Sequence, residues 1–334
     1  MSDKTKIEWT DATWNPITGC SVVSAGCKNC YAMKLAGTRL QHDPSRIGLT
    51  QDSAAGPVWN GQVRFNEHWL EQPLHWRRPR QVFVCAHGDL FHEAVPDEWI
   101  DRVFDVMRYA PHHTFQVLTK RPARMHAYLT RFMRSPSWDG YITRDGVASG
   151  DRPEGSVLFT PAGWPLPNVW LGVSVENQVA ADERIPWLLQ TPAAIRWISA
   201  EPLLGRVDLF GVSYGGGLYV NVLSVQDTPE VIVQPRIDWV VVGGESGAGA
   251  RPMHPEWARS LRNQCAAAGV PFFFKQWGEF APTVKVVNEQ THKTEDYDLG
   301  GAMTRVGKKA AGRLLDGVEH NGYPGGAPCL SASN

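Results

Sequence analysis

Residues 237–247 read IDWVVVGGESG, a run of β-branched and aromatic residues that ends in a glycine-rich polar turn. Other segments repeat this layout of a short apolar run, a polar residue and then a helical pattern. They begin at residues 82, 114, 169, 195 and 270. Near-continuous apolar runs between turns are typical of strands buried on both faces of a parallel sheet. The pattern therefore predicts an α/β fold.

Amphipathic helical patterns lie between these runs, for instance at 97–109 and 255–268. A weaker strand at 62–65 and one leading into Gly19 and Cys20 raise the expected number of strands to about eight. We therefore expect a (β/α)8-like TIM barrel. A partial barrel of about six or seven strands is the alternative.

Residues 1–280 are expected to form this barrel as a single domain, with a cysteine-containing loop near the N-terminus. Two stretches interrupt the strand–helix pattern, at 135–167 and 206–235, and are interpreted as insertions. Residues 281–334 are expected to form a C-terminal extension. Its Gly-, Pro- and Ser-rich end is expected to be mobile.

Polar residues follow the predicted strands, where a parallel barrel opens its active-site mouth. We expect them to share one cavity, although each alone is also compatible with a helix cap or a surface charge. They are Cys20, Cys27, Cys30, Asp89, Lys120, Glu176, Glu201, Glu245 and Lys275. Lys120, Glu201 and Lys275 are the catalytic candidates. The turn at Gly243 and Gly244 lacks a complete nucleotide-binding motif, and we interpret it as a tight turn that lets a cofactor approach the backbone.

Cys20, Cys27 and Cys30 form a C-x6-C-x2-C cluster in a chain whose other three cysteines are scattered. Clustered thiols in a reducing compartment indicate metal ligands or catalysis. Zinc sites need four ligands, whereas three cysteines on an iron–sulfur cube leave one iron open. The alternatives are unrelated buried thiols, or a zinc site completed by a distant residue such as His42 or His87.

Composition narrows the class of protein. The chain has 334 residues, 43% of them hydrophobic, and a formal net charge of −1, so no overall basic field indicates nucleic-acid binding. No apolar run is long enough for a membrane span, and the first residues lack a signal-peptide core. We therefore expect a cytoplasmic protein with no membrane partner. The oligomeric state is left open.

Several segments resemble a family of proteins of unknown function found in phages, prophages and bacteria. The resemblance covers nearly the whole chain. The matching segments are 7–16, 19–32, 89–92, 118–122, 170–177, 201–205, 242–246 and 273–278. Through its cysteine loop and barrel, that family is similar to radical SAM enzymes, more distantly to spore photoproduct lyase. The alternative partial barrel is the form found in those enzymes.

This resemblance implies a 4Fe-4S cluster on Cys20, Cys27 and Cys30, with S-adenosylmethionine on the fourth iron. It further implies a 5′-deoxyadenosyl radical and an external electron donor. Tyr31 is expected near the adenine, and Asp89, Glu176, Gly243, Gly244 and Glu245 are expected around the cofactor. The departure from the common pattern is the six residues, rather than three, between the first two cysteines.

Three functions remain open from the sequence. The first is a radical SAM-like iron–sulfur enzyme, with nucleic acid or a nucleotide as the candidate class of substrate. The second is a zinc-dependent barrel hydrolase in which a metal-bound water attacks and a glutamate acts as base. The third is a non-catalytic, metal-stabilised phage-associated protein. Iron and sulfide content separates the first from the other two.

Overall fold

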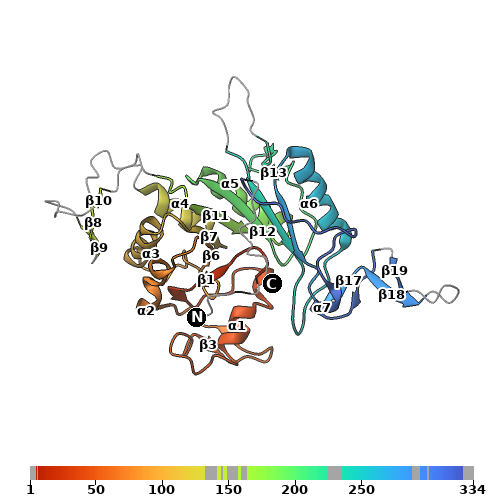
Figure 1. Cartoon of the computed structure of the whole chain (residues 1–334), viewed down its shortest axis with the longest axis horizontal. Coiled ribbons are helices and arrows are strands. Elements are labelled where there is room, and N and C mark those ends of the chain that lie inside the picture. Colours follow the sequence, from red (N-terminus) through yellow and green to blue (C-terminus); the bar gives the residue numbers. More distant parts are fainter. Residues whose placement is uncertain are drawn as a thin grey trace, which may run out of the picture.

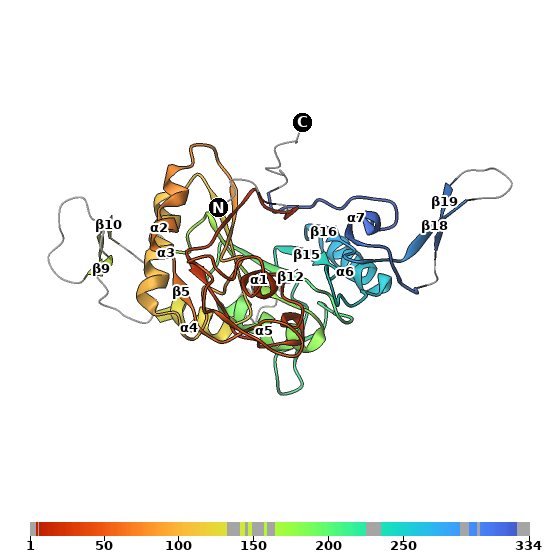
Figure 2. The ribbon, with the colours of Figure 1, turned by 90° about the horizontal axis from the view of Figure 1, so that it is seen from below.

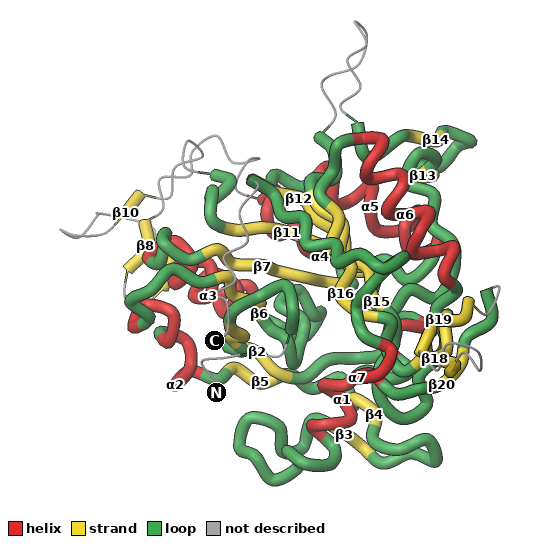
Figure 3. Tube along the Cα trace, turned by 45° about the vertical axis from the view of Figure 1, so that its right-hand side comes forward, coloured by secondary structure: helices red, strands yellow, loops and turns green. Residues whose placement is uncertain are grey.

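The structure of the chain is a computed structural model that describes residues 5, 7–131, 141–143, 146–148, 157–158, 164–224, 235–287, 294–298 and 301–325. Its centre is a seven-stranded parallel sheet, curled into a partial barrel (Figures 1 and 3). Each strand lies beside the next along the chain. In order they are β1 (Ala12–Trp14), β6 (Gln81–Val84), β7 (Thr114–Thr119), β11 (Val169–Ser174), β12 (Ile195–Ala200), β15 (Trp239–Gly243) and β16 (Phe272–Gln276).

This sheet confirms the α/β class and agrees with the partial barrel named as the alternative. It corrects the expected eighth strand. The segment at 62–65 forms β5 (Arg64–Phe65), which pairs antiparallel with β2 (Ile17–Thr18) outside the main sheet. The physical reason is visible in its sequence, QVRF, which alternates polar and apolar residues. Such a strand suits a half-exposed antiparallel pair better than a parallel sheet buried on both faces.

Four helices pack on the convex face of the sheet (Figure 1). They are α3 (Asp97–Tyr109), α4 (Pro122–Thr130), α5 (Gln178–Gln190) and α6 (Pro255–Ala268). The helices at 97–109 and 255–268 thus match their predicted bounds. Alternate strand residues such as Val117, Val173 and Val240 point toward the helices and form the main core.

The remaining strand residues point to the concave face, where the half nearer the strand starts is filled by aromatic rings. Trp197, Trp239 and Phe273 come from the sheet, and Trp9 and Tyr323 come from the two ends of the described chain. The ring centre of Trp239 lies 5.0 Å from that of Tyr323 and 6.1 Å from that of Trp9. The interior is therefore a packed core at this end and not a pore.

A long connection between β1 and β6 lies beside the C-terminal ends of the parallel strands. It contains η1 (Ala25–Cys27), α1 (Tyr31–Ala36), a hairpin of β3 (Thr50–Gln51) and β4 (Val58–Trp59), α2 (Glu67–Leu70) and η2 (Gln72–His75). The predicted insertion at 135–167 lies largely outside the described residues. Its described strands are β8 (Tyr141–Thr143), β9 (Gly146–Ala148) and β10 (Val157–Leu158).

The predicted insertion at 206–235 lies between β12 and β15, and its described residues form no helix. Its described part holds a hairpin of β13 (Val212–Ser213) and β14 (Tyr219–Val220). After β16 come β17 (Phe280–Ala281), paired with β20 (Thr304–Arg305), and α7 (Lys308–Ala311). The hairpin of β18 (Thr283–Val287) and β19 (Thr294–Asp298) projects from the body (Figure 2). No described helix is both long and apolar enough to cross a bilayer.

Candidate functional site

The parallel strands end around one cavity of about 280 Å³. Its walls come from the segment before α1 and from the ends of β6, β7, β12, β15 and β16. Most of the predicted site residues line it, namely Cys20, Cys27, Cys30, Tyr31, Asp89, Lys120, Glu201, Gly244, Glu245 and Lys275. Glu176 lies behind the wall against Lys120, and Gly243 lies behind it against Glu201. We call this the mouth cavity.

The cysteine loop, residues 19–31, follows β2 and closes one side of the mouth cavity. It starts at Gly19, whose φ of +95° favours glycine. A second glycine, Gly26, is needed because a Cβ there would lie 2.3 Å from Glu176 Oε1. Cys20, Cys27 and Cys30 are free thiols.

The donor chemistry of these three thiols suits an iron–sulfur cluster. Among the described residues, no group of three or more His, Cys, Asp or Glu side chains is arranged to hold a metal ion. The loop thus brings the thiols to one cavity without gathering them around one point. Of the two histidines considered as a fourth zinc ligand, His42 is exposed and outside the cavity lining, and His87 Nδ1 accepts from Arg46 Nε at 3.4 Å.

Cys20, at the start of the cysteine loop, contacts the buried side chain of Arg121. Arg121 Nη1 donates to Cys20 Sγ at 3.6 Å and to Asp89 Oδ2 at 3.0 Å. Asp89 also accepts from Thr119 Oγ1 at 2.7 Å and from the Lys120 backbone N–H at 3.1 Å. Burial, followed by the nearby Asp89 charge, raises the pKa of the Cys20 thiol to about 12. Asp89 is thus engaged by donors of the protein itself and anchors this corner.

Glu176 is the centre of a second buried network. It is 1% exposed and accepts from Arg184 Nη1 at 2.8 Å and from Ser24 Oγ at 2.7 Å, and Lys120 Nζ lies 3.6 Å away. Burial opposes its charged form, but Lys120 and Arg184 outweigh burial and hold the pKa of Glu176 below its usual value. Lys120 Nζ also donates to Ser174 Oγ at 2.9 Å and lines the cavity.

Glu245 contacts the cysteine loop near its C-terminal end, at Asn29. Its Oε1 accepts from Arg251 Nη2 at 2.7 Å, and its Oε2 accepts from Arg251 Nε at 3.0 Å and Asn29 Nδ2 at 2.9 Å. Burial opposes the carboxylate, yet the hydrogen bonds from Arg251 and Asn29 hold the pKa of Glu245 below its usual value. A ligand ammonium at Glu245, as the resemblance implies, would compete with this arginine.

Glu201 and Lys275 form the charged pair most open to the cavity. Lys275 Nζ lies 3.1 Å from Glu201 Oε1, and their side chains are 14% and 18% exposed. Trp9 Nε1 donates to Glu201 Oε2 at 3.4 Å from below. Both side chains line the cavity, so a ligand placed there can reach one cation and one anion together.

The Gly243–Gly244 turn contains a bulge and close contacts within the chain. The ladder between β15 and β16 shifts at Gly243, which pairs with Gln276. This β-bulge lets two successive side chains, Lys275 and Gln276, line the same cavity. A Cβ on Gly243 would lie 2.4 Å from Glu201 Oε1, and one on Gly244 would lie 1.9 Å from the Trp277 carbonyl oxygen. Close packing against backbone thus requires glycine at 244, whereas a side chain at 243 would displace the Glu201 carboxylate.

Tyr31 opens α1 beside the cavity. Its hydroxyl donates to the Ala86 carbonyl oxygen at 2.7 Å, and its ring meets that of His87 edge-on at 5.7 Å. The residue is 50% exposed and lines the mouth cavity. One face of the ring therefore remains available to a planar ligand.

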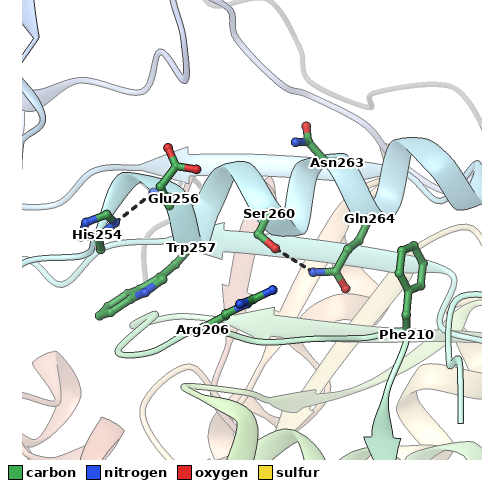
Figure 4. A pocket seen from close by; sticks show the side chains of 8 residues that line it. All are labelled: Arg206, Phe210, His254, Glu256, Trp257, Ser260, Asn263 and Gln264. Carbon is green, nitrogen blue, oxygen red and sulfur yellow. Dashed lines mark hydrogen bonds between the residues drawn. The ribbon is translucent and has the colours of Figure 1, made fainter. Parts of the chain in front are cut away.

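A second, larger hollow of about 600 Å³ lies on the outside of α6 (Figure 4). Its lining residues are Arg206, Phe210, His254, Glu256, Trp257, Ser260, Asn263 and Gln264. The buried Gln264 accepts from Leu209 N–H at 2.7 Å and donates to the Val207 carbonyl oxygen at 3.0 Å. Its amide thus holds the loop before β13. None of the predicted site residues lies there, so the mouth cavity remains the candidate site.

Sequence reasoning missed the partners that hold the predicted residues in place. These are Ser24, Asn29, Arg121, Arg184 and Arg251. Arg121 is adjacent to a predicted residue, and Ser24 and Asn29 lie inside the cysteine loop. A requirement that every buried carboxylate have a cationic partner would have directed attention to the three arginines.

The chain matches the model of the family described as "Protein of unknown function (DUF5131)" over residues 4–324. Neither the curated proteins nor the solved structures give a match. The match spans the cysteine loop, the seven strands and all the cavity walls. The chain therefore belongs to this family.

Proposed function

We propose that the mouth cavity is the active site of a radical SAM-like iron–sulfur enzyme. Cys20, Cys27 and Cys30 would hold a 4Fe-4S cluster, and S-adenosylmethionine would bind beside it. Together these groups supply one-electron reductive cleavage of a carbon–sulfur bond, which yields methionine and a radical able to take hydrogen from a substrate.

One observation carries this proposal: three thiols from a single loop line the same cavity as the charged ends of the parallel strands. Cys85, which follows β6, also lines this cavity, so the feature that sets the other three thiols apart is that one short loop carries them all. The curled parallel sheet adds support, because active sites in related barrels lie at the C-terminal strand ends.

The contacts within the cavity divide its residues into two groups. Asp89 and Glu176 are engaged by the buried Arg121 and Arg184, Glu245 is engaged by the half-buried Arg251, and all three carboxylates position the walls. Glu201 and Lys275 are less enclosed and are the better candidates for an amino acid's ammonium and carboxylate. Charged hydrogen bonds of this type contribute about 1.5–3 kcal/mol each.

The first experiment measures iron, acid-labile sulfide and zinc in protein purified and reconstituted without oxygen. We expect four irons and four sulfides per chain, the content of the proposed cluster, and broad absorption near 400 nm (an order-of-magnitude position for thiolate-ligated clusters). Cys20→Ala, Cys27→Ala and Cys30→Ala should each lose most of it, whereas Cys85→Ala and Cys265→Ala should keep it. Zinc in place of iron, or full iron in the three loop variants, would rule out the proposal.

The second experiment adds S-adenosylmethionine and a chemical reductant to the reconstituted protein. Release of 5′-deoxyadenosine that depends on all three loop cysteines is the expected result. A protein with a complete cluster that neither binds nor cleaves S-adenosylmethionine would be an iron–sulfur scaffold instead.

A further inference from the structure

Arg121 is the most enclosed cation beside the cysteine loop. It follows β7 and caps the start of α4, and its side chain is 4% exposed. The guanidinium turns back from the helix toward the mouth cavity, which it helps to line. Neither helix capping nor surface solubility explains a buried cation in this position.

The contacts of Arg121 fix its orientation completely. Nε donates to Glu93 Oε2 at 2.7 Å, and Nη2 donates to Ser21 Oγ at 2.6 Å. Nη1 donates to Asp89 Oδ2 at 3.0 Å and also reaches Cys20 Sγ at 3.6 Å. Two carboxylates thus compensate the charge, and the rigid planar fork delivers one N–H to a cysteine sulfur.

The three cysteine sulfurs differ in this respect. Cys27 Sγ lies 3.8 Å from the Ser24 hydroxyl, which is a neutral group. Cys20 instead receives an N–H from a charged and buried donor, Arg121. Hydrogen bonds to the sulfurs and nearby charge are the means by which proteins set the potential of an iron–sulfur cluster.

We propose that Arg121 donates a hydrogen bond to the Cys20 thiolate and thereby raises the reduction potential of the cluster. The inference rests on the proposed function, because it requires the cluster. Arg121 is a positioning residue in this proposal, because it acts on the cluster through Cys20. Reduction adds negative charge to the cluster, and a fixed cation with an N–H aimed at sulfur stabilises that reduced state.

The experiment compares the midpoint potentials of reconstituted wild-type protein and Arg121→Gln, by optical redox titration without S-adenosylmethionine. We expect the equilibrium constant for reduction to fall about tenfold, which is about 59 mV for a one-electron couple. Arg121→Lys, which keeps the charge but loses the fork, should fall between the two. Lys34→Gln is the matched control, since Lys34 contacts the cysteine loop at Asn29 and not at a sulfur.

If Arg121→Gln takes up no cluster, the midpoint potential of Glu93→Gln provides a second test. Glu93 is 65% exposed, so its substitution leaves the core intact and removes a negative charge beside the guanidinium. The proposal predicts a higher midpoint potential for this variant. A full cluster with an unchanged midpoint in Arg121→Gln, an equal shift in Lys34→Gln, or no rise in Glu93→Gln would each overturn it. Absence of any cluster in the wild type would instead remove the proposed function itself.

Discussion

The concave face of the sheet has two halves. The same strands form both, but aromatic side chains fill one half and polar side chains line the other. Trp197 and Phe273 belong to the aromatic half, and Ser199 and Lys275 follow two residues later in the polar half. Alternation along a strand returns each side chain to the same face after two residues. The strand geometry is therefore shared, and side-chain chemistry alone separates a packed core from a charged cavity. The aromatic half should govern stability, and the polar half should govern ligand binding.

The largest expected loss of stability comes from Trp239→Ala in the aromatic half. Trp239 is fully buried, contacts Trp9, Trp197 and Tyr323, and donates from Nε1 to the Gly322 carbonyl oxygen at 2.7 Å. Deleting such a ring leaves a cavity and costs about 3–5 kcal/mol. Urea unfolding followed by circular dichroism measures it. The exposed Trp187→Ala is the control, and an equal loss there would contradict the division into halves.

A buried charge pair of the polar half should have the next largest effect. Glu176→Gln leaves Arg184, which is 2% exposed, without its carboxylate, and we expect a loss of about 2–3 kcal/mol in the free energy of unfolding. Replacing both Glu176 and Arg184 by Met should restore part of the loss, because the buried guanidinium is then removed and the remaining Lys120 is 20% exposed and can be solvated. A double variant less stable than Glu176→Gln would show that the pair itself, and not charge compensation, stabilises this wall.

The same carboxylate should make stability depend on pH. The folded pKa of Glu176 lies below its ordinary value of 4.5, so its contribution to stability is present above that unfolded value and is lost as the pH falls through the folded pKa. We expect the difference in unfolding free energy between wild type and Glu176→Gln to shrink between pH 6 and the acid range below 4.5. Unfolding titrations at several pH values measure it. A difference in unfolding free energy that grows as the pH falls would contradict the predicted direction.

The smallest expected change in stability is that of Lys275→Met at the open pair. Glu201 can be solvated from the cavity, so we expect a loss of about 1 kcal/mol or less. Binding of S-adenosylmethionine to the reconstituted protein should weaken about tenfold, because one charge contact is lost. Calorimetric titration separates the two effects. Lys309→Met on α7 is the control for loss of a lysine, and unchanged affinity in Lys275→Met would remove this residue from the binding site.

The strand–turn pattern predicted the six apolar strands because their runs are long and buried on both faces. It wrongly predicted a barrel strand at 62–65, where a short alternating segment pairs locally with β2 outside the main sheet. The pattern also predicted most of the residues that share the mouth cavity, since parallel strands bring their ends together, but Glu176 lies behind its wall. It could not reveal that Asp89 and Glu245 are occupied by Arg121 and Arg251, because pairing of side chains across loops depends on tertiary packing.

The two ends of the described chain meet on Trp239, and this has a consequence for synthesis of the protein. Asn321 bridges Phe273, and Tyr323 and Trp9 pack against the same indole. A nascent chain emerges from the ribosome in order, so the strands of the sheet can pair before residue 323 is available. Until then the aromatic half of the concave face lacks the Tyr323 ring and stays accessible to water and to chaperones. Completion of the core therefore waits for residue 323, even though most of the sheet can form earlier in translation.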